Sequence, residues 1–213
     1  MKHLRIFTSI CLLFAFVLCL AACGDKTETT SETTVEDYKT AYAEFLADYL
    51  KDADEDTVAD YKFVLVDING DDTPELILDT QVYATGMCLM TYADGTVDYI
   101  DDAKVSENLS NMSYSEGNNL VVFNGGQQGS YTDAIYTIED GKWKELHFGS
   151  YSIDPTVEAE TDEKLDCTWD GDEVTEEEYD DNYNEALDGN DVTYLNSSET
   201  GISYTELLEQ LAK

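Results

Sequence analysis

A run of oxygen-bearing side chains at alternate positions is the part of this sequence with the clearest chemistry. The first, third, fifth and ninth residues of one loop are Asp67, Asn69, Asp71 and Glu75, and the carbonyl of Thr73 is available at the seventh. Alternate residues of a tight loop can point to one side, and Ca²⁺ takes about six to eight oxygen ligands. The spacing therefore predicts a Ca²⁺ site built from these five residues.

The same spacing occurs elsewhere, because Asp, Glu and Asn are frequent in this chain. The other matches are Asp52, Asp54, Asp56 and Asp60, and Asp180, Asn182, Asn184 and Asp188. Only the loop of residues 67–75 combines Gly70 and Pro74 with strand-like apolar runs on both sides, residues 61–66 and 75–78. We therefore prefer the 67–75 loop as the ion site, with a solvated acidic hairpin as the alternative interpretation.

Residues 63–78 resemble the Asp-x-Asn-x-Asp calcium loops of dockerins, EF-hands and integrin-type repeats. They are especially similar to the "DINGDG-x-PEL" element of uncharacterised lipoproteins of Gram-positive bacteria. An EF-hand loop has Gly at its sixth and Glu at its twelfth position, whereas this chain has Asp72 and Leu78 there. A shorter strand–loop–strand site closed by Glu75 fits better, and the resemblance implies an ion preference without an activity.

The first 22 residues have the three-part layout of an export signal. A basic start with Lys2 and Arg5 is followed by the apolar residues 6–20 and by two alanines. Residues 20–23, Leu-Ala-Ala-Cys, resemble the lipobox of bacterial lipoproteins. The resemblance implies that residues 1–22 are removed, that Cys23 is lipidated, and that the protein is held at the extracytoplasmic face of the cell membrane. An ordinary signal peptide cleaved after Ala22 is the alternative.

The charge of the chain excludes one class of partner and sets the domain boundaries. The sequence has 47 acidic and 11 basic residues among 213, a net charge of −36, which becomes −38 when Lys2 and Arg5 leave with the signal. Nucleic acid is excluded, because binding to phosphates needs a basic surface. Residues 23–34 comprise the lipidated Cys23 and a stretch without apolar side chains, which predicts a flexible tether. A single domain is expected over residues 35–213.

Hydrophobic periodicity predicts an α+β fold. Apolar residues recur at helical spacing over residues 38–50, with Thr33 or Thr34 as N-cap. Strand-like segments over residues 61–66, 75–78, 87–92, 120–123, 134–138 and 143–148 are separated by turn signals. Residues 124–129 are rich in glycine and are interpreted as a long hairpin turn.

Two capping boxes mark late helices. Thr175 is followed three residues later by Glu178, and Ser203 by Glu206, in front of an apolar stripe formed by Tyr204, Leu207, Leu208 and Leu211. The predicted architecture is an antiparallel β-meander sheet packed with an N-terminal helix and two short C-terminal helices.

The remaining cysteines predict a disulfide. Cys11 and Cys19 lie in the signal and Cys23 carries the lipid, so Cys88 and Cys167 remain as thiols outside the reducing cytoplasm. We predict that these two are paired, and two separate buried thiols are the alternative.

Catalytic patterns are nearly absent from the chain. His147 is the only histidine after residue 22, and we expect it to be a surface or half-buried strand residue. We therefore expect a non-catalytic binding or surface-interaction module, whose cell-surface or glycan ligand the sequence does not name. The alternative is a secreted, carboxylate-dependent hydrolase acting on a glycan.

Overall fold

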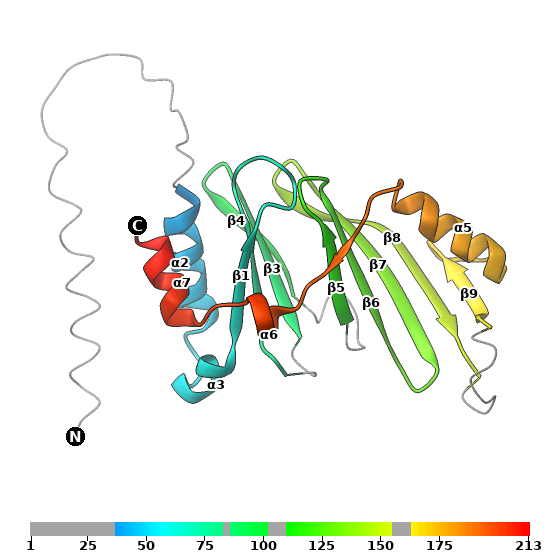
Figure 1. The fold of residues 1–213 in the computed structure, drawn as a ribbon, viewed down its shortest axis with the longest axis horizontal. Coiled ribbons are helices and arrows are strands. Elements are labelled where there is room, and N and C mark those ends of the chain that lie inside the picture. The colour runs from blue at the N-terminus through cyan, green and yellow to red at the C-terminus, as the bar shows by residue number, and fades with distance from the viewer. Residues whose placement is uncertain (1–36, 83–85, 102–109, 155–162) are drawn as a thin grey trace, which may run out of the picture. The chain divides into compact units, whose positions relative to one another are not determined.

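Two antiparallel sheets form the framework of the computed structural model, which describes residues 37–82, 86–101, 110–154 and 163–213 (Figure 1). Sheet A has the order β1 (Lys62–Val66), β2 (Glu75–Asp79), β3 (Met87–Ala93) and β4 (Thr96–Asp101). Sheet B has the order β10 (Asp172–Glu173), β9 (Leu165–Trp169), β8 (Lys142–Ser152), β7 (Ser130–Glu139), β6 (Leu120–Gln127), β5 (Ser110–Ser115) and β11 (Thr193–Tyr194). The expected signal peptide, Cys23 and tether lie outside the described residues.

Five helices accompany the sheets in the described part of the chain. They are α2 (Asp37–Tyr49), α3 (Glu55–Asp60), α5 (Glu176–Ala186), α6 (Ser197–Thr200) and α7 (Tyr204–Leu211). The predicted α+β class, with an N-terminal helix and short C-terminal helices, is confirmed. Both predicted capping boxes are present: the hydroxyls of Thr175 and Ser203 accept hydrogen bonds from the third helical N–H, and the glutamates reach back.

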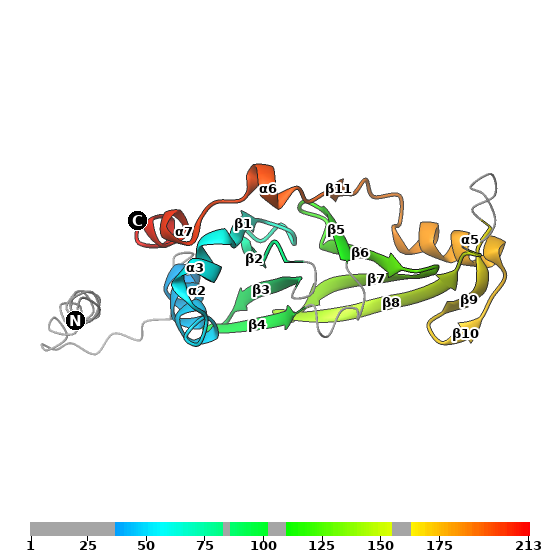
Figure 2. The same cartoon turned by 90° about the horizontal axis from the view of Figure 1, so that it is seen from below.

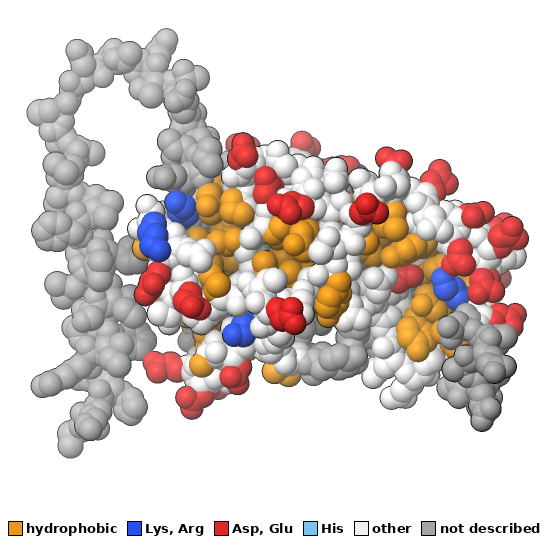
Figure 3. All heavy atoms as spheres, viewed as in Figure 1, with side chains coloured by type: hydrophobic (Ala, Val, Ile, Leu, Met, Phe, Trp, Pro, Cys, Tyr) orange, Lys and Arg blue, Asp and Glu red, His pale blue; other side chains and the backbone are white. Residues whose placement is uncertain are grey.

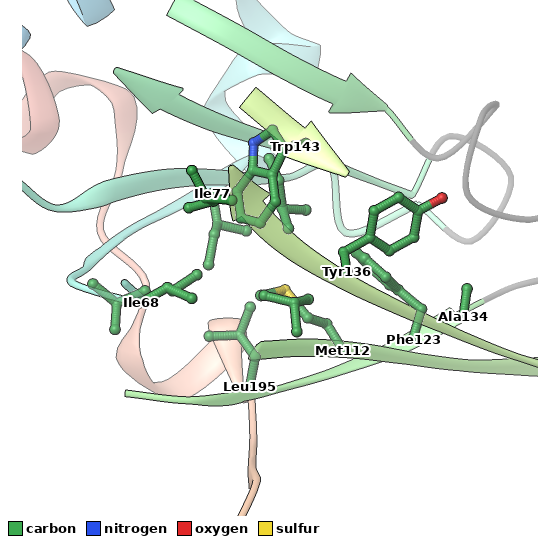
Figure 4. Packing of buried hydrophobic residues seen from close by; sticks show 12 residues of the cluster. Ile68, Ile77, Met112, Phe123, Ala134, Tyr136, Trp143 and Leu195 are labelled. Atoms are coloured by element: carbon green, nitrogen blue, oxygen red, sulfur yellow. The ribbon is translucent and has the colours of Figure 1, made fainter. Parts of the chain in front are cut away.

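The predicted meander is divided between the two sheets, which share one hydrophobic core. Ile68 and Ile77 reach this core from sheet A and its loop, and Met112, Phe123 and Trp143 from sheet B (Figure 4). Along each strand, alternate side chains face opposite sides of a sheet. The apolar residues of the inner faces therefore bury one another, as in two packed sheets.

Helices cover the outer faces of both sheets. Helices α2 and α7 lie side by side against sheet A, where Tyr42, Leu46 and Leu207 pack on Phe63 and Leu76 (Figure 1). Helix α5 lies against sheet B, where Tyr179 packs among residues of β6, β7 and β9 (Figure 2). The result is a layered arrangement of helices, sheet A, sheet B and helix.

The segment after β11 connects the two sheets. Strand β11 pairs with β5 in sheet B, and the side chain of Leu195 enters the shared core. The hydroxyl of Ser197 then donates to the carboxylate of Asp79 in sheet A, and Ile202 forms a bridge with Phe63. These contacts with both sheets hold residues 193–202 in place as a strap.

The glycine-rich residues 124–129 are mostly strand, so the predicted long hairpin turn is wrong. Strand β6 continues to Gln127 and pairs with β7 as far as Ser130. A Cβ atom on Gly126 would lie 2.4 Å from Cδ1 of Tyr131, which leaves room only for glycine. The glycine here reflects the close approach of an aromatic ring to the backbone of the neighbouring strand.

Cys88 and Cys167 are not joined by a disulfide, so the predicted pairing is wrong. Cys88 is buried between sheet A and helices α2 and α7, whereas Cys167 is buried between sheet B and helix α5. A disulfide needs Cα atoms within about 7 Å of each other. The two sheets lie between these thiols and keep them in separate clusters.

Candidate functional site

The carboxylate of Asp67 organises the 67–75 loop, which connects β1 with β2. Its Oδ1 accepts hydrogen bonds from the backbone N–H of Gly70 at 2.7 Å and of Asp71 at 3.3 Å. Its Oδ2 accepts one from the N–H of Asp72 at 3.1 Å. Asp67 therefore points into the loop and holds the turn through local hydrogen bonds from its backbone.

Asn69 and Asp71 complete the inside of the loop. The Asn69 side chain donates from Nδ2 to Oδ2 of Asp71 at 3.0 Å and accepts from the Asp71 N–H at 3.1 Å. Oδ1 of Asp71 accepts from the N–H of Thr73 at 2.7 Å. Asp72 has a φ of 67°, a left-handed conformation that Asp tolerates better than most residues. The structure thus brings Asp67, Asn69 and Asp71 together.

Glu75 lies beneath the loop, where its side chain is 1% exposed. Its Oε2 accepts from the N–H of Ile68 at 2.8 Å, and its Oε1 from the hydroxyl of Thr91 at 3.1 Å. Burial raises the pKa of Glu75 to about 7, and the negative charges of Asp71 and Asp67 add to the increase. Glu75 therefore closes the loop from within, at an electrostatic cost that its two hydrogen bonds offset only in part.

The 67–75 loop is also attached to other elements. The N–H groups of Gly117 and Asn119, in the turn between β5 and β6, donate to the carbonyls of Asp67 and Ile68 at 3.1 and 2.7 Å. On the other side, the Tyr42 hydroxyl of helix α2 donates to the carbonyl of Pro74 at 3.0 Å. The loop therefore contacts sheet B and the N-terminal helix as well as sheet A.

The donor chemistry of the loop fits a hard cation. Within the described residues, no three His, Cys, Asp or Glu side chains are arranged as a metal-binding group. The loop has a mixed set instead: the carboxylates of Asp67 and Asp71, the amide oxygen of Asn69 and the carbonyl of Thr73. The carboxylate of Glu75 has about four lone-pair sites and uses two for its hydrogen bonds. All five predicted residues thus carry oxygen atoms of the type that Ca²⁺ prefers.

The two competing acidic spacings have helical roles. Asp54 is the N-cap of α3, and its carboxylate accepts from the N–H and hydroxyl of Thr57. Asp180 and Asn184 lie on α5, where Asp180 forms an ion pair with Lys164. A helix spreads alternate residues around its axis. These spacings therefore do not place their oxygens together as the 67–75 loop does.

A buried acidic network in sheet B was not predicted from the sequence. Asp133 is 8% exposed, and its carboxylate accepts from the Tyr179 hydroxyl at 2.8 Å and from Nδ2 of Asn124 at 2.7 Å. A Cβ atom on Gly149 would lie 2.5 Å from the Tyr179 hydroxyl, so this glycine admits the tyrosine to the sheet. The sequence around Asp133 contains no motif. The only sign of its burial is that Asp133 and Ile135, two residues apart in one strand, face the same side of the sheet.

His147 lies in β8 and is partly exposed, as predicted. Its Nδ1 is 2.8 Å from Oδ2 of Asp170, and its ring stacks on Trp169. Oδ1 of Asp170 accepts from the N–H of Phe148 at 2.9 Å. Asp170 therefore holds the turn after β9 against β8 and fixes the orientation of the imidazole.

Acidic side chains are spread over the face of the domain shown in Figure 3, with few basic ones among them.

Comparisons of the chain with protein-family models, with curated proteins and with solved structures find no match. None of the helices in the described ranges is long and apolar enough to cross a membrane.

Proposed function

We propose that this chain is a lipid-anchored protein of the extracytoplasmic face of the cell membrane, where it acts as a binding or surface-interaction module with a structural Ca²⁺ ion. The proposed location is supported by the lipobox resemblance at Cys23 and by the polar residues 24–34 that follow it. The ion rests on one observation above all: Asp67, Asn69 and Asp71 all turn their side chains into the same loop.

Ca²⁺ in this loop would be held by side-chain oxygens of Asp67, Asn69, Asp71 and Glu75 and by the Thr73 carbonyl. Its charge would offset the repulsion among three carboxylates, one of them buried. Its effect would reach sheet B, because Gly117 and Asn119 hold the same loop. We assign the ion a structural role. The charge of −38 on the mature chain disfavours polyanionic ligands and leaves neutral or cationic ones.

Thermal melting tests the ion. Extracellular calcium modules bind at about 10⁻⁴ to 10⁻³ M, so Ca²⁺ at about ten times the dissociation constant adds roughly 1.4 kcal/mol to the free energy of unfolding. This corresponds to a rise of a few degrees in melting temperature relative to EGTA. Mg²⁺ should have a smaller effect, because it loses its water ligands reluctantly and needs a tighter octahedron.

The control is the double variant Asp67→Ala with Asp71→Ala, measured under the same two conditions. Its melting temperature should not respond to Ca²⁺. An equal response of the variant and the wild type would mean diffuse screening of the acidic surface, and the assignment of the ion to this loop would be wrong.

Membrane fractionation tests the anchor. The wild type should partition into detergent, and Cys23→Ala should remain in the aqueous phase, because one cysteine carries the lipid. Cys19→Ala is the matched control, since it alters the signal but leaves Cys23 available. If Cys23→Ala still fractionates with membranes, the lipobox assignment fails.

A further inference from the structure

The chain contains two Asn–Gly pairs, and the structure places them in very different surroundings. Asn69–Gly70 lies in the 67–75 loop, where Gly70 is exposed, and Asn124–Gly125 lies in strand β6. An Asn–Gly pair can react with itself, because glycine has no side chain to shield its backbone nitrogen. What decides the rate is whether the backbone nitrogen can reach the side-chain carbon of the asparagine.

The reaction is deamidation through a cyclic imide. The Gly70 nitrogen loses its proton and attacks Cγ of Asn69, so that an N–Cγ bond forms, the Cγ–Nδ2 bond breaks, and ammonia leaves with the proton. Water then opens the ring at either carbonyl and gives aspartate or isoaspartate. No oxidant, reductant or cofactor is needed, and water is the only co-reactant.

The folded loop restrains both reacting groups. The Gly70 N–H donates to Oδ1 of Asp67 at 2.7 Å, so a deprotonated nitrogen would lie beside a carboxylate and be repelled by it. The Asn69 amide is held at both of its polar atoms by Asp71. These hydrogen bonds hold the Gly70 nitrogen against Asp67 and the Asn69 amide against Asp71, and so restrain the approach of the two reacting groups.

Asn124–Gly125 is protected in another way. Gly125 lies between β5 and β7, opposite Ser110 and Thr132, within the hydrogen-bonded ladder. The Asn124 amide donates to the buried carboxylate of Asp133 at 2.7 Å. Its protection comes from the strand pairing of sheet B, whereas the hydrogen bonds that restrain Asn69 and Gly70 lie within the 67–75 loop.

We propose that Asn69–Gly70 is a site of spontaneous deamidation whose rate is set by the order of the 67–75 loop, with Asp67 as the restraining group. Loop opening starts the reaction while the sheets remain folded. The product replaces an amide donor to Asp71 with a carboxylate, so the hydrogen bond between the two side chains becomes a repulsion. An isoaspartate would in addition lengthen the backbone of the turn. This proposal does not depend on Ca²⁺ and is tested in EGTA.

Peptide mapping by mass spectrometry tests the proposal on the full chain, incubated at neutral pH and sampled over time. In the wild type, deamidation at Asn69 should be slow, and unfolding in urea should accelerate it at both asparagines. In Asp67→Ala, Asn69 should react about tenfold faster, which corresponds to the loss of one hydrogen bond to a charged group. Asn124 should remain as slow as in the wild type, and thereby reports that the variant is folded.

The variant Asp67→Asn separates charge from hydrogen bonding, because its amide oxygen can still accept from Gly70. Asn69 should react faster than in the wild type but more slowly than in Asp67→Ala. This variant decides the matter if Asp67→Ala accelerates Asn124 as well and is therefore unfolded. The proposal is overturned if folded wild type reacts at Asn69 as fast as in urea, or if neither variant accelerates Asn69 selectively.

Discussion

Sheet A and sheet B each bury an acidic side chain, but they surround it differently. Glu75 in sheet A accepts hydrogen bonds from Ile68 and Thr91 while the carboxylates of Asp67 and Asp71 lie close by. Asp133 in sheet B is held by a phenol and an amide, both neutral. Burial alone therefore does not mark an ion site. A buried carboxylate among other carboxylates gains from a cation, whereas one between neutral donors is already satisfied.

The largest effect is expected in sheet B. Asp133→Ala removes the acceptor of the fully buried Tyr179 hydroxyl and one acceptor of the Asn124 amide. Leaving such groups unpaired in the interior should cost about 3 kcal/mol of unfolding free energy. Chemical denaturation measures this loss.

Glu139→Ala is the matched control for Asp133, because it removes an acid from the same strand. Glu139 forms an exposed ion pair with Lys144, so its loss should change the unfolding free energy by less than about 0.5 kcal/mol. Equal effects of the two substitutions would show that Asp133 is not the centre of a buried network.

In sheet A, the pH dependence of stability should depend on Glu75. Its pKa rises from 4.5 to about 7 on folding, so the folded state binds the proton more tightly and protonation stabilises it. The stabilisation is complete below about pH 4.5 and is lost as the pH rises to about 7. In EGTA, the difference in unfolding free energy between wild type and Glu75→Gln should change by roughly 3 kcal/mol at most across this range.

Thr91→Val sharpens this measurement. The Thr91 hydroxyl lowers the pKa of Glu75 by donating to it. Its removal should therefore raise this pKa, and the pH range over which stability is lost should extend to higher pH. A profile for Glu75→Gln that parallels the wild type would mean that Glu75 is not the group responsible.

The smallest effect is expected from the two cysteines, one in each half. Since no disulfide joins Cys88 to Cys167, a reducing agent should leave the melting temperature of the domain unchanged. Both thiols should be labelled after unfolding without reduction. In the folded protein Cys167 should react slowly, because burial raises the pKa of its thiol. If neither thiol is labelled in the unfolded chain, Cys88 and Cys167 are joined by a disulfide after all.

Local patterns were sufficient for several elements. The helical spacing of residues 38–50, the two capping boxes and the apolar strands around the 67–75 loop all correspond to elements of the structure. Each depends on residues within one turn or one strand, where periodicity and hydrogen bonding are short-range. Strands β4, β5, β10 and β11 were not predicted, because at least half of the residues in each are polar and their pairing depends on neighbouring strands.

The sequence by itself determined the α+β class, the grouping of Asp67, Asn69 and Asp71, and the expectation of an exported, strongly acidic chain, since composition and spacing along one loop contain this information. Only the tertiary structure decided that the strands form two sheets, that Cys88 and Cys167 lie in separate clusters, and that Asp133 meets Tyr179. These outcomes depend on contacts between residues far apart in the chain, such as the 46 positions that separate Asp133 from Tyr179. No periodicity or motif within a short segment contains such contacts, because they are selected by how complete faces of sheets and helices pack.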